Sequence, residues 1–219
     1  KILSDNGMTV TGLCRGGMFP AADKAGLQAA IDDNLRAIDD AKAIDAQCLV
    51  LVCGGMPEGS KDILGCHEMV RDGIAAVLPH ARAVGMPLAI EPLHPMYAAE
   101  RAVINSIEHA NDLCDELGEG VGIAVDVYHL WWDPYLEREI KRAAKADPKR
   151  ILAFHICDWL APTKDIWLDR GMMGDGVINI PQIRGWVEDA GYEGFAEVEI
   201  LSSYWWDQDP DEVVRICVE

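Results

Sequence analysis

Short apolar runs alternate with longer amphipathic segments along the whole chain. The runs are rich in β-branched and other apolar residues, which is typical of strands. They predict six strands, at residues 9–14, 48–53, 87–91, 121–127, 151–156 and 195–200. Because their hydrophobicity is nearly continuous rather than alternating, we expect strands that are covered on both faces, as in a parallel sheet.

The longer segments carry apolar residues at helical spacing. The first series is Leu27, Ile31, Leu35 and Ile38, and a second is Val70, Ile74, Leu78 and Ala81. Capping residues mark further helices: Asn105 or Ser106 begins one that runs to Gly118, and Asp209 followed by Pro210 begins the last. Strands and helices therefore alternate as βαβα, with no linker or repeat between them.

Two architectures suit this alternation, an open doubly wound sheet and a (β/α)₈ barrel. The sheet has no G-x-G-x-x-G turn to support it, and the chain opens almost directly into a strand. We therefore expect residues 1–219 to form a single α/β domain, a (β/α)₈ TIM barrel that lacks its first one or two βα units in this chain.

Charge and cysteine content narrow the cellular setting. The formal net charge is −18, and the 37 acidic residues are spread along the chain, so nucleic acid and anionic membranes are not expected partners. No apolar run reaches the ~20 residues of a membrane-spanning helix. Most of the seven cysteines lie in apolar runs without a C-x-x-C pair, which fits a reducing cytoplasm. We expect a cytoplasmic protein.

Polar residues at the strand ends are informative, because in a parallel barrel the carboxyl ends of the strands surround the active site. Four consecutive predicted strands end with one, namely Glu91, Asp126, His155 and Glu199. A buried carboxylate needs an ion-pair partner, hydrogen bonds or a metal ion, since an unpaired buried charge is costly. For Glu91 alone, a structural salt bridge and metal ligation both stay open. A lone histidine such as His155 is more often a core residue, but its three acidic companions favour ligation.

The last strand carries two acids, Glu197 and Glu199, on one face, because strand side chains alternate. Glu199 is nearer the carboxyl end and is the predicted ligand, whereas Glu197 lies deeper or pairs with a base. Two glutamates, one aspartate and one histidine form an oxygen-rich set that suits Mn²⁺, Mg²⁺ or Co²⁺. We expect Mn²⁺ foremost and keep Zn²⁺ as a further alternative.

Aromatic and basic residues near these strand ends are candidates for substrate binding. Tyr128, Trp131 and Trp132 would wall the apolar side of a sugar ring, or else pack in the core or against another subunit. In the glycine-rich stretch DRGMMGDGVINI, Arg170 would hold a substrate oxygen or phosphate. The alternative for Arg170 is a surface ion pair with Asp175.

The motifs AIEPLHP, VDVYHLWWDP, FHICDW, the GDG loop and GYEGFAEVEI resemble the xylose-isomerase-like TIM barrel superfamily, and within it the sugar phosphate isomerase/epimerase group. The resemblance covers nearly the whole chain. It implies that Glu91, Asp126, His155 and Glu199 hold a divalent metal ion and that the two glutamates are catalytic. It also implies that His129, three residues after the aspartate, binds a substrate oxygen.

One family feature is missing from the sequence. Epimerases of the group often have an arginine shortly after the metal histidine, but the matching stretch here reads WLAPTKD. Lys164 or Arg170 would take its place. Together with His129 and Trp132, these residues complete the predicted substrate-binding set.

The predicted activity is isomerisation or epimerisation of a small sugar or sugar phosphate, with proton transfer through a metal-stabilised enediolate. A metal-dependent sugar or inosose dehydratase and a non-catalytic sugar-binding protein are the alternatives. A DNA-repair endonuclease of the same superfamily would need a basic groove, which the net charge of −18 opposes. The resemblance further implies a homo-oligomer.

Overall fold

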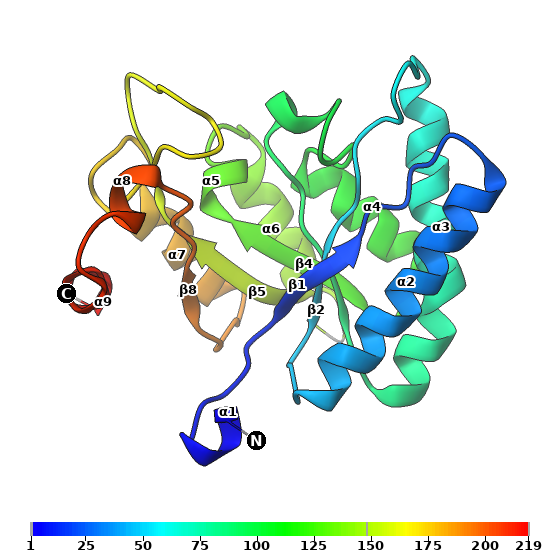
Figure 1. The fold of residues 1–219 in the computed structure, drawn as a ribbon, viewed down its shortest axis with the longest axis horizontal. Coiled ribbons are helices and arrows are strands. Elements are labelled where there is room, and N and C mark those ends of the chain that lie inside the picture. Colours follow the sequence, from blue (N-terminus) through cyan, green and yellow to red (C-terminus); the bar gives the residue numbers. More distant parts are fainter. Residues whose placement is uncertain (1, 148, 219) are drawn as a thin grey trace.

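Six parallel strands form one curled sheet, which is part of a barrel (Figure 1). The computed structural model describes residues 2–147 and 149–218. In order of pairing, the strands are β1 (Leu13–Gly17), β2 (Leu49–Val52), β3 (Leu88–Ile90), β4 (Val121–Asp126), β5 (Ile151–Ile156) and β8 (Ala196–Val198). The predicted barrel architecture, seen here as a partial barrel of parallel strands, is confirmed.

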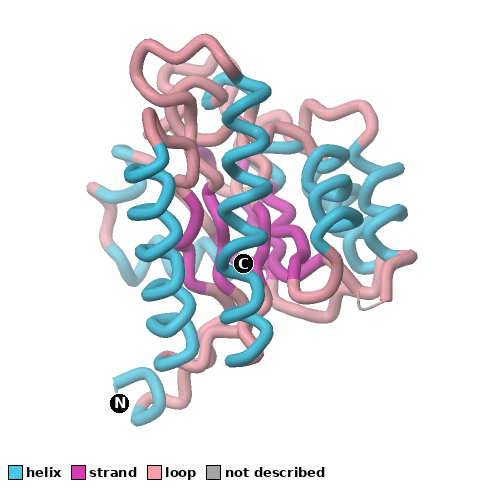
Figure 2. The backbone as a smooth tube through the Cα atoms, turned by 90° about the vertical axis from the view of Figure 1, so that its right-hand side faces the viewer, coloured by secondary structure: helices cyan, strands magenta, loops and turns pink. Residues whose placement is uncertain are grey.

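Helices follow the strands and cover the outer side of the sheet, and Figure 2 shows two long helices, α2 and α3, in front of the strands. The longer helices are α2 (Lys24–Ala43), α3 (Ile63–Val84), α4 (Ile107–Leu117), α6 (Leu136–Ala144), α7 (Ile180–Asp189) and α9 (Pro210–Val218). The shorter ones are α1 (Ile2–Asp5), η1 (Pro95–Tyr97), α5 (Val127–Leu130) and α8 (Ser203–Trp206). None of the helices in the described ranges is long and apolar enough to cross a membrane.

The helix boundaries follow from the capping chemistry of the sequence. The Ser106 hydroxyl accepts a hydrogen bond from the His109 amide, so Ser106 rather than Asn105 caps α4. Asp209 accepts from the amides of the first turn of α9, which begins at Pro210 as predicted.

The first predicted strand was placed too early. The sequence pattern indicated residues 9–14, whereas β1 spans Leu13–Gly17 and pairs with β2 through a register shift between Cys14 and Gly16. Gly17 has a φ of 106°, and a Cβ at this position would lie 2.0 Å from the carbonyl oxygen of Val52. The strand therefore ends in glycines that fit closely against β2, and glycines carry no hydrophobic signal.

The inner face of the curled sheet is lined mostly by small residues. A cluster of buried residues from four strands, Cys48, Val50, Ala89, Ala124 and Ala153, forms this layer. A much larger cluster fills the space between the sheet and the outer helices. Because these inner residues are small, there is room above them, at the carboxyl ends of the strands, for polar side chains that point to the same face of the sheet.

Between β5 and α7 the chain forms a feature that the pattern of apolar runs did not predict. A short antiparallel ribbon joins β6 (Asp158–Trp159) to β7 (Arg170–Gly171). The loop between these strands therefore leaves the sheet and returns to it. This ribbon places Arg170 close to the strand ends.

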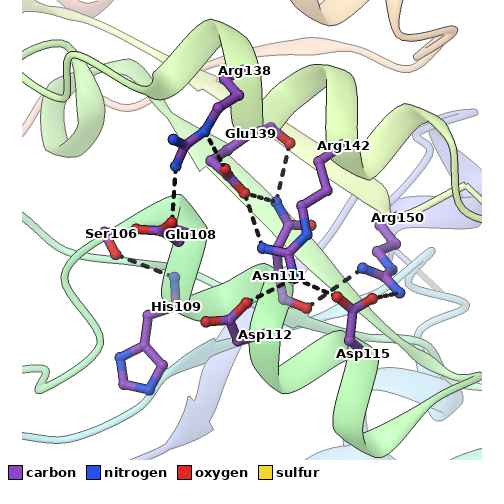
Figure 3. Close-up of polar contacts among 10 residues, drawn as sticks. All are labelled: Ser106, Glu108, His109, Asn111, Asp112, Asp115, Arg138, Glu139, Arg142 and Arg150. Atoms are coloured by element: carbon purple, nitrogen blue, oxygen red, sulfur yellow. Dashed lines mark hydrogen bonds and ion pairs between the residues drawn. The ribbon is translucent and has the colours of Figure 1, made fainter.

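A polar network fastens α4 to α6 on the outer side (Figure 3). Glu139 is 3% exposed. Its carboxylate accepts hydrogen bonds from Asn111 Nδ2 at 3.2 Å, Arg138 Nε at 2.7 Å and Arg142 Nη1 at 3.2 Å. Arg142 also pairs with Asp112 at 2.7 Å. Because Glu139 is almost fully buried, its partners offset the cost of removing its charge from water.

Replacing Glu139 with alanine is expected to lower the free energy of unfolding by about 1–3 kcal/mol, because it removes the shared acceptor of this network. Urea denaturation followed by circular dichroism measures the change. Glu137→Ala is the matched control on the same helix, since the pair of Glu137 with Lys141 is exposed and contributes under about 1 kcal/mol. Equal losses in the two variants would contradict the assignment.

Candidate metal centre

The four polar strand-end residues meet in space. Glu91 follows β3, Asp126 ends β4, His155 lies in β5 and Glu199 follows β8. Each offers one ligand atom, and these four atoms all lie within 4.8 Å of one another. Side chains that are separated by more than a hundred positions in the sequence therefore share one site.

This convergence follows from strand geometry. For Glu91, Asp126 and His155, the residue two positions earlier belongs to the inner cluster of small residues, and for Glu199 it is Glu197, which lines the same hollow as Glu199. Since side chains on a strand alternate, a step of two keeps the same face and moves one layer toward the carboxyl end. Asp126 and His155 are also direct register partners. The four side chains thus form one layer above the inner layer of small residues.

The acids of the cluster differ in burial. Asp126 is fully buried, and its Oδ1 accepts a hydrogen bond from the Tyr128 amide at 2.7 Å. Burial raises the pKa of Asp126 to about 7; Arg170 opposes this shift, and the charges of Glu199 and Glu91 add to it. Glu91 is 3% exposed, whereas the Glu199 side chain is 35% exposed. Glu199 is therefore the acid of the cluster that solvent reaches most easily.

His155 is held by its neighbour Glu91, whose Oε1 lies 2.9 Å from His155 Nδ1. Burial opposes protonation of His155, but the hydrogen bond and charge of Glu91, with the charges of Asp126 and Glu199, raise its pKa to about 9. Without another cation in the site, the imidazole is protonated at neutral pH and supplies positive charge to the acids.

Both the geometry and the charges of this cluster fit a divalent cation. Opposite ligands around a hard cation with bonds of ~2.1–2.5 Å lie ~4–5 Å apart, which agrees with the observed spread of 4.8 Å. Three carboxylates face the single guanidinium of Arg170 and the imidazole of His155. A divalent ion would balance the remaining negative charge and release the proton of His155.

Arg170 lies inside this cluster rather than on the surface. The residue is 3% exposed, and its Nη1 is 3.0 Å from Glu199 Oε2 and 3.5 Å from Asp126 Oδ2. Its guanidinium also stacks over the Tyr128 ring, 4.4 Å from the centroid. The alternative interpretation, a surface pair with Asp175, is wrong because Arg170 is buried.

His129 lies beside the cluster, with Nε2 3.6 Å from Asp126 Oδ2 and 3.4 Å from Arg170 Nη2. Its Nδ1 accepts the backbone N–H of His94 at 3.3 Å, which favours the tautomer with the proton on Nε2. Burial, and after it the charge of Arg170, hold the pKa of His129 well below 6.5. A neutral imidazole with an N–H at the edge of the cluster suits a substrate oxygen.

Two residues of the predicted substrate-binding set lie elsewhere. The indole N–H of Trp132 donates to the carbonyl of His129 at 2.8 Å, and its ring lines a separate hollow beside His67 and His109. Lys164 is exposed, and within residues 2–147 and 149–218 its ammonium makes no hydrogen bond or ion pair. The substrate roles of Trp132 and Lys164 stay predictions.

Three residues beside the cluster, His94, Tyr97 and Trp159, escaped the sequence analysis. His94 stacks on Trp159 with ring centroids 4.9 Å apart, and Tyr128 packs on the same indole at 4.7 Å. The hydroxyls of Tyr97 and Tyr128 both donate to the carbonyl of Ile166, which fastens the loop between β6 and β7. One signal was available, because His94 follows Glu91 by three residues, as His129 follows Asp126.

Asp158 holds the glycine-rich loop that follows β7. It is fully buried and accepts backbone hydrogen bonds from Gly174 at 3.0 Å, Gly176 at 2.9 Å and Ile178 at 3.0 Å. This aspartate thus fixes the segment directly after Arg170 and contributes to the position of that guanidinium.

A small hollow of about 110 Å³ opens on this cluster from the side of β1 and β8, lined by Cys14, His155, Glu197 and Glu199, among others. It gives a small molecule access to Glu199 and His155. Glu197 belongs to the deeper layer, where its charge adds to burial in raising the pKa of Cys48 to about 12.

Comparison with known proteins places the chain in a family. A crystal structure of a protein from Sinorhizobium meliloti 1021 is 60% identical, has a TM-score of 0.96 and is matched over 99% of this chain and 78% of that one. The inosose isomerase of Halalkalibacterium halodurans is 22% identical over 204 residues, which are 90% of this chain and 68% of that protein.

A structure of the IolI protein with a bound zinc atom has a TM-score of 0.76 at 18% identity, with 96% of this chain and 72% of that one covered. At this identity the likeness concerns the fold. Residues 1–216 match the family model described as Xylose isomerase-like TIM barrel. The chain therefore belongs to the xylose isomerase-like TIM barrel family.

Proposed function

We propose that this protein is a divalent-metal-dependent isomerase or epimerase of a small sugar or sugar phosphate. The observation that carries the proposal is the convergence of Glu91, Asp126, His155 and Glu199 within 4.8 Å at the carboxyl ends of four parallel strands. The relative named inosose isomerase supports an isomerase activity.

The four residues would hold the metal ion, with Mn²⁺ foremost and Mg²⁺, Co²⁺ or Zn²⁺ as alternatives. The zinc atom bound to the IolI protein supports a divalent ion in this fold. The chemistry that such an ion supplies is polarisation of a substrate carbonyl, which acidifies the neighbouring C–H.

Glu91 and Glu199 are the proposed proton carriers. One removes the proton next to the carbonyl, and the other returns a proton at the neighbouring carbon or on the opposite face. Glu91 is positioned by His155 Nδ1 at 2.9 Å and Glu199 by Arg170 Nη1 at 3.0 Å. The stereochemistry of the substrate decides which glutamate acts first.

His129 and Arg170 would bind and orient the substrate. The neutral His129 presents its Nε2–H beside Asp126, where a sugar hydroxyl or carbonyl oxygen would accept a hydrogen bond from it. Arg170 keeps a buried positive charge beside the developing negative charge on the substrate oxygens. The rings of Tyr128 and Trp159 give this side of the site an apolar wall.

We expect solvent deuterium to enter a sugar C–H only when the protein carries a divalent ion. NMR of C3–C6 ketoses and their phosphates in D₂O, with Mn²⁺ removed by chelation and then restored or replaced by Mg²⁺, measures this exchange. A product with the formula of the substrate indicates isomerisation or epimerisation, whereas loss of water indicates a dehydratase. Exchange that is unaffected by chelation would overturn the metal-dependent mechanism.

Glu199→Gln is expected to lower kcat by about 10²–10⁴-fold, because the amide cannot accept the transferred proton. Glu193→Gln, an exposed position before β8, is the control and should retain full activity. Circular dichroism and thermal unfolding establish that both variants are folded. A folded Glu199→Gln enzyme with normal turnover would remove Glu199 from the reaction.

The apparent affinity for the metal ion should rise with pH. The pKa of His155 is raised to about 9, and ligation requires its neutral form, so binding at pH 7 displaces this proton. Affinity should therefore increase about tenfold per pH unit between pH 7 and 8, and more steeply below pH 7, where Asp126, whose pKa is raised to about 7, also loses a proton on ligation. Calorimetry with Mg²⁺ in buffers of different ionisation enthalpy counts the released protons.

His80→Gln provides the control for this titration, because His80 is exposed and pairs with Asp39 away from the cluster. This variant should release the same number of protons as the wild type. An affinity that does not change between pH 6 and 8 would show that His155 is not displaced from a protonated state.

A further inference from the structure

A second cationic position lies near the candidate metal centre. Arg101 follows η1 and lines a hollow of about 300 Å³ together with Tyr97, Glu100, Ile166 and Trp167. Its guanidinium carbon lies 4.2 Å from the centre of the Trp167 ring. Stacking on the indole fixes the plane of the guanidinium and leaves the edge with its N–H donors free of the ring.

Arg101 lacks the partners that other arginines have. In this acidic protein, every other arginine of residues 2–147 and 149–218 forms a hydrogen bond or an ion pair, including Arg82 with two backbone carbonyls. The guanidinium of Arg101 forms neither with any described residue, and its Nε is buried without an acceptor. Glu100 lines the same hollow but forms no ion pair with it. Because no carboxylate among the described residues pairs with it, the guanidinium at the edge of this hollow is available to an acceptor from outside the chain.

The position lies one aromatic ring away from the residues beside the candidate metal centre. The Tyr97 ring contacts His129 at 5.7 Å on one side and Trp167 at 5.8 Å on the other. Cys14 lines the hollow beside His155 and Glu199, and the charges of both the acidic cluster and Arg101 act on its thiol. Burial raises the pKa of this thiol to about 12, Glu91 and Glu199 raise it further, and Arg101 opposes them.

The loop that carries Trp167 is held in place by hydrogen bonds and packing. Ile166, the preceding residue, accepts hydrogen bonds from the hydroxyls of Tyr97 and Tyr128. Trp167 packs against the buried cluster of Leu93, Tyr97 and Ala102. The indole is thus a fixed platform, and the guanidinium above it loses little freedom when an anion binds.

We propose that Arg101, stacked on Trp167, binds an anionic oxyacid group, a phosphate monoester or a carboxylate, at the end of the substrate remote from the reacting carbon. This inference rests on the proposed function, whose substrate class it narrows from sugars in general to anionic sugars. The planar fork of N–H donors matches the oxygens of either group. Arg101 is in this view a specificity-determining residue and takes no part in proton transfer.

The test compares binding of matched probes by calorimetry in the presence of Mg²⁺. D-Fructose 6-phosphate and D-fructose form the phosphate pair, and D-glucuronate and D-glucose form the carboxylate pair. The wild type should prefer the anionic member of at least one pair, and the pair that shows the preference identifies the oxyacid. Arg101→Gln should reduce this preference ratio about 10- to 100-fold.

Arg184→Gln is the matched control, since Arg184 is exposed on α7 and pairs with Glu188. It should leave the ratio unchanged. Arg101→Lys keeps the charge without the planar fork and should lose part of the preference, which provides a second test if Arg101→Gln does not fold. Equal ratios in the wild type and in the folded Arg101 variants, or no preference in the wild type, would overturn the proposal.

The two proposals fail in different ways. Anion binding that depends on Arg101, without exchange of any sugar proton, would refute the proposed isomerase and leave the subsite in place. Proton exchange on neutral sugars, with a preference ratio that does not respond to Arg101, would refute the subsite and leave the isomerase.

Discussion

Three carboxylates and one imidazole crowd a buried end of the sheet, and the repulsion among the carboxylates determines what surrounds them. At Asp126 burial is the main cause that raises the pKa to about 7, Arg170 opposes the shift, and the charges of Glu199 and Glu91 add to it. Positive charge comes from two sides, from Arg170 at Asp126 and Glu199 and from the imidazole of His155 at Glu91. In the proposed metal-bound state, a divalent ion would take over the balancing role of the imidazole proton.

The same electrostatic requirement explains the architecture of the segment between β5 and α7. Arg170 must reach a buried layer, and the β6–β7 ribbon brings it there while Asp158 fixes the glycine-rich loop behind it. Stacking on Tyr128 then sets the plane of the guanidinium. Each of these contacts restrains a charged side chain that would otherwise be costly to bury.

The sequence predicted those features that depend on local periodicity. The parallel strands were visible as apolar runs, and the alternation of side chains pointed to the residues at their carboxyl ends. Contacts made by the loop between β6 and β7 do not follow from periodicity. The carbonyl of Ile166 accepts hydrogen bonds from two tyrosine hydroxyls of other segments. Arg101 stacks on Trp167 of the same loop. The range of β1 was predicted too early in the chain because the strand ends in glycines. Glycines carry no apolar signal, and here they are required by the close packing against β2.

The charges also bear on how a substrate would lie in the site. In the proposed metal-bound state the charges of the four residues, Arg170 and the ion balance, so the candidate metal centre gives an anionic group no net electrostatic attraction. Arg101 offers attraction on the far side of Tyr97, with no competing carboxylate within ion-pair distance among the described residues. Attraction at Arg101 alone would orient an anionic sugar with its carbonyl toward the four residues of the candidate metal centre. Orientation of this kind needs no new contact at the reacting carbon, because Arg101 favours this position of the anionic group over the reversed one.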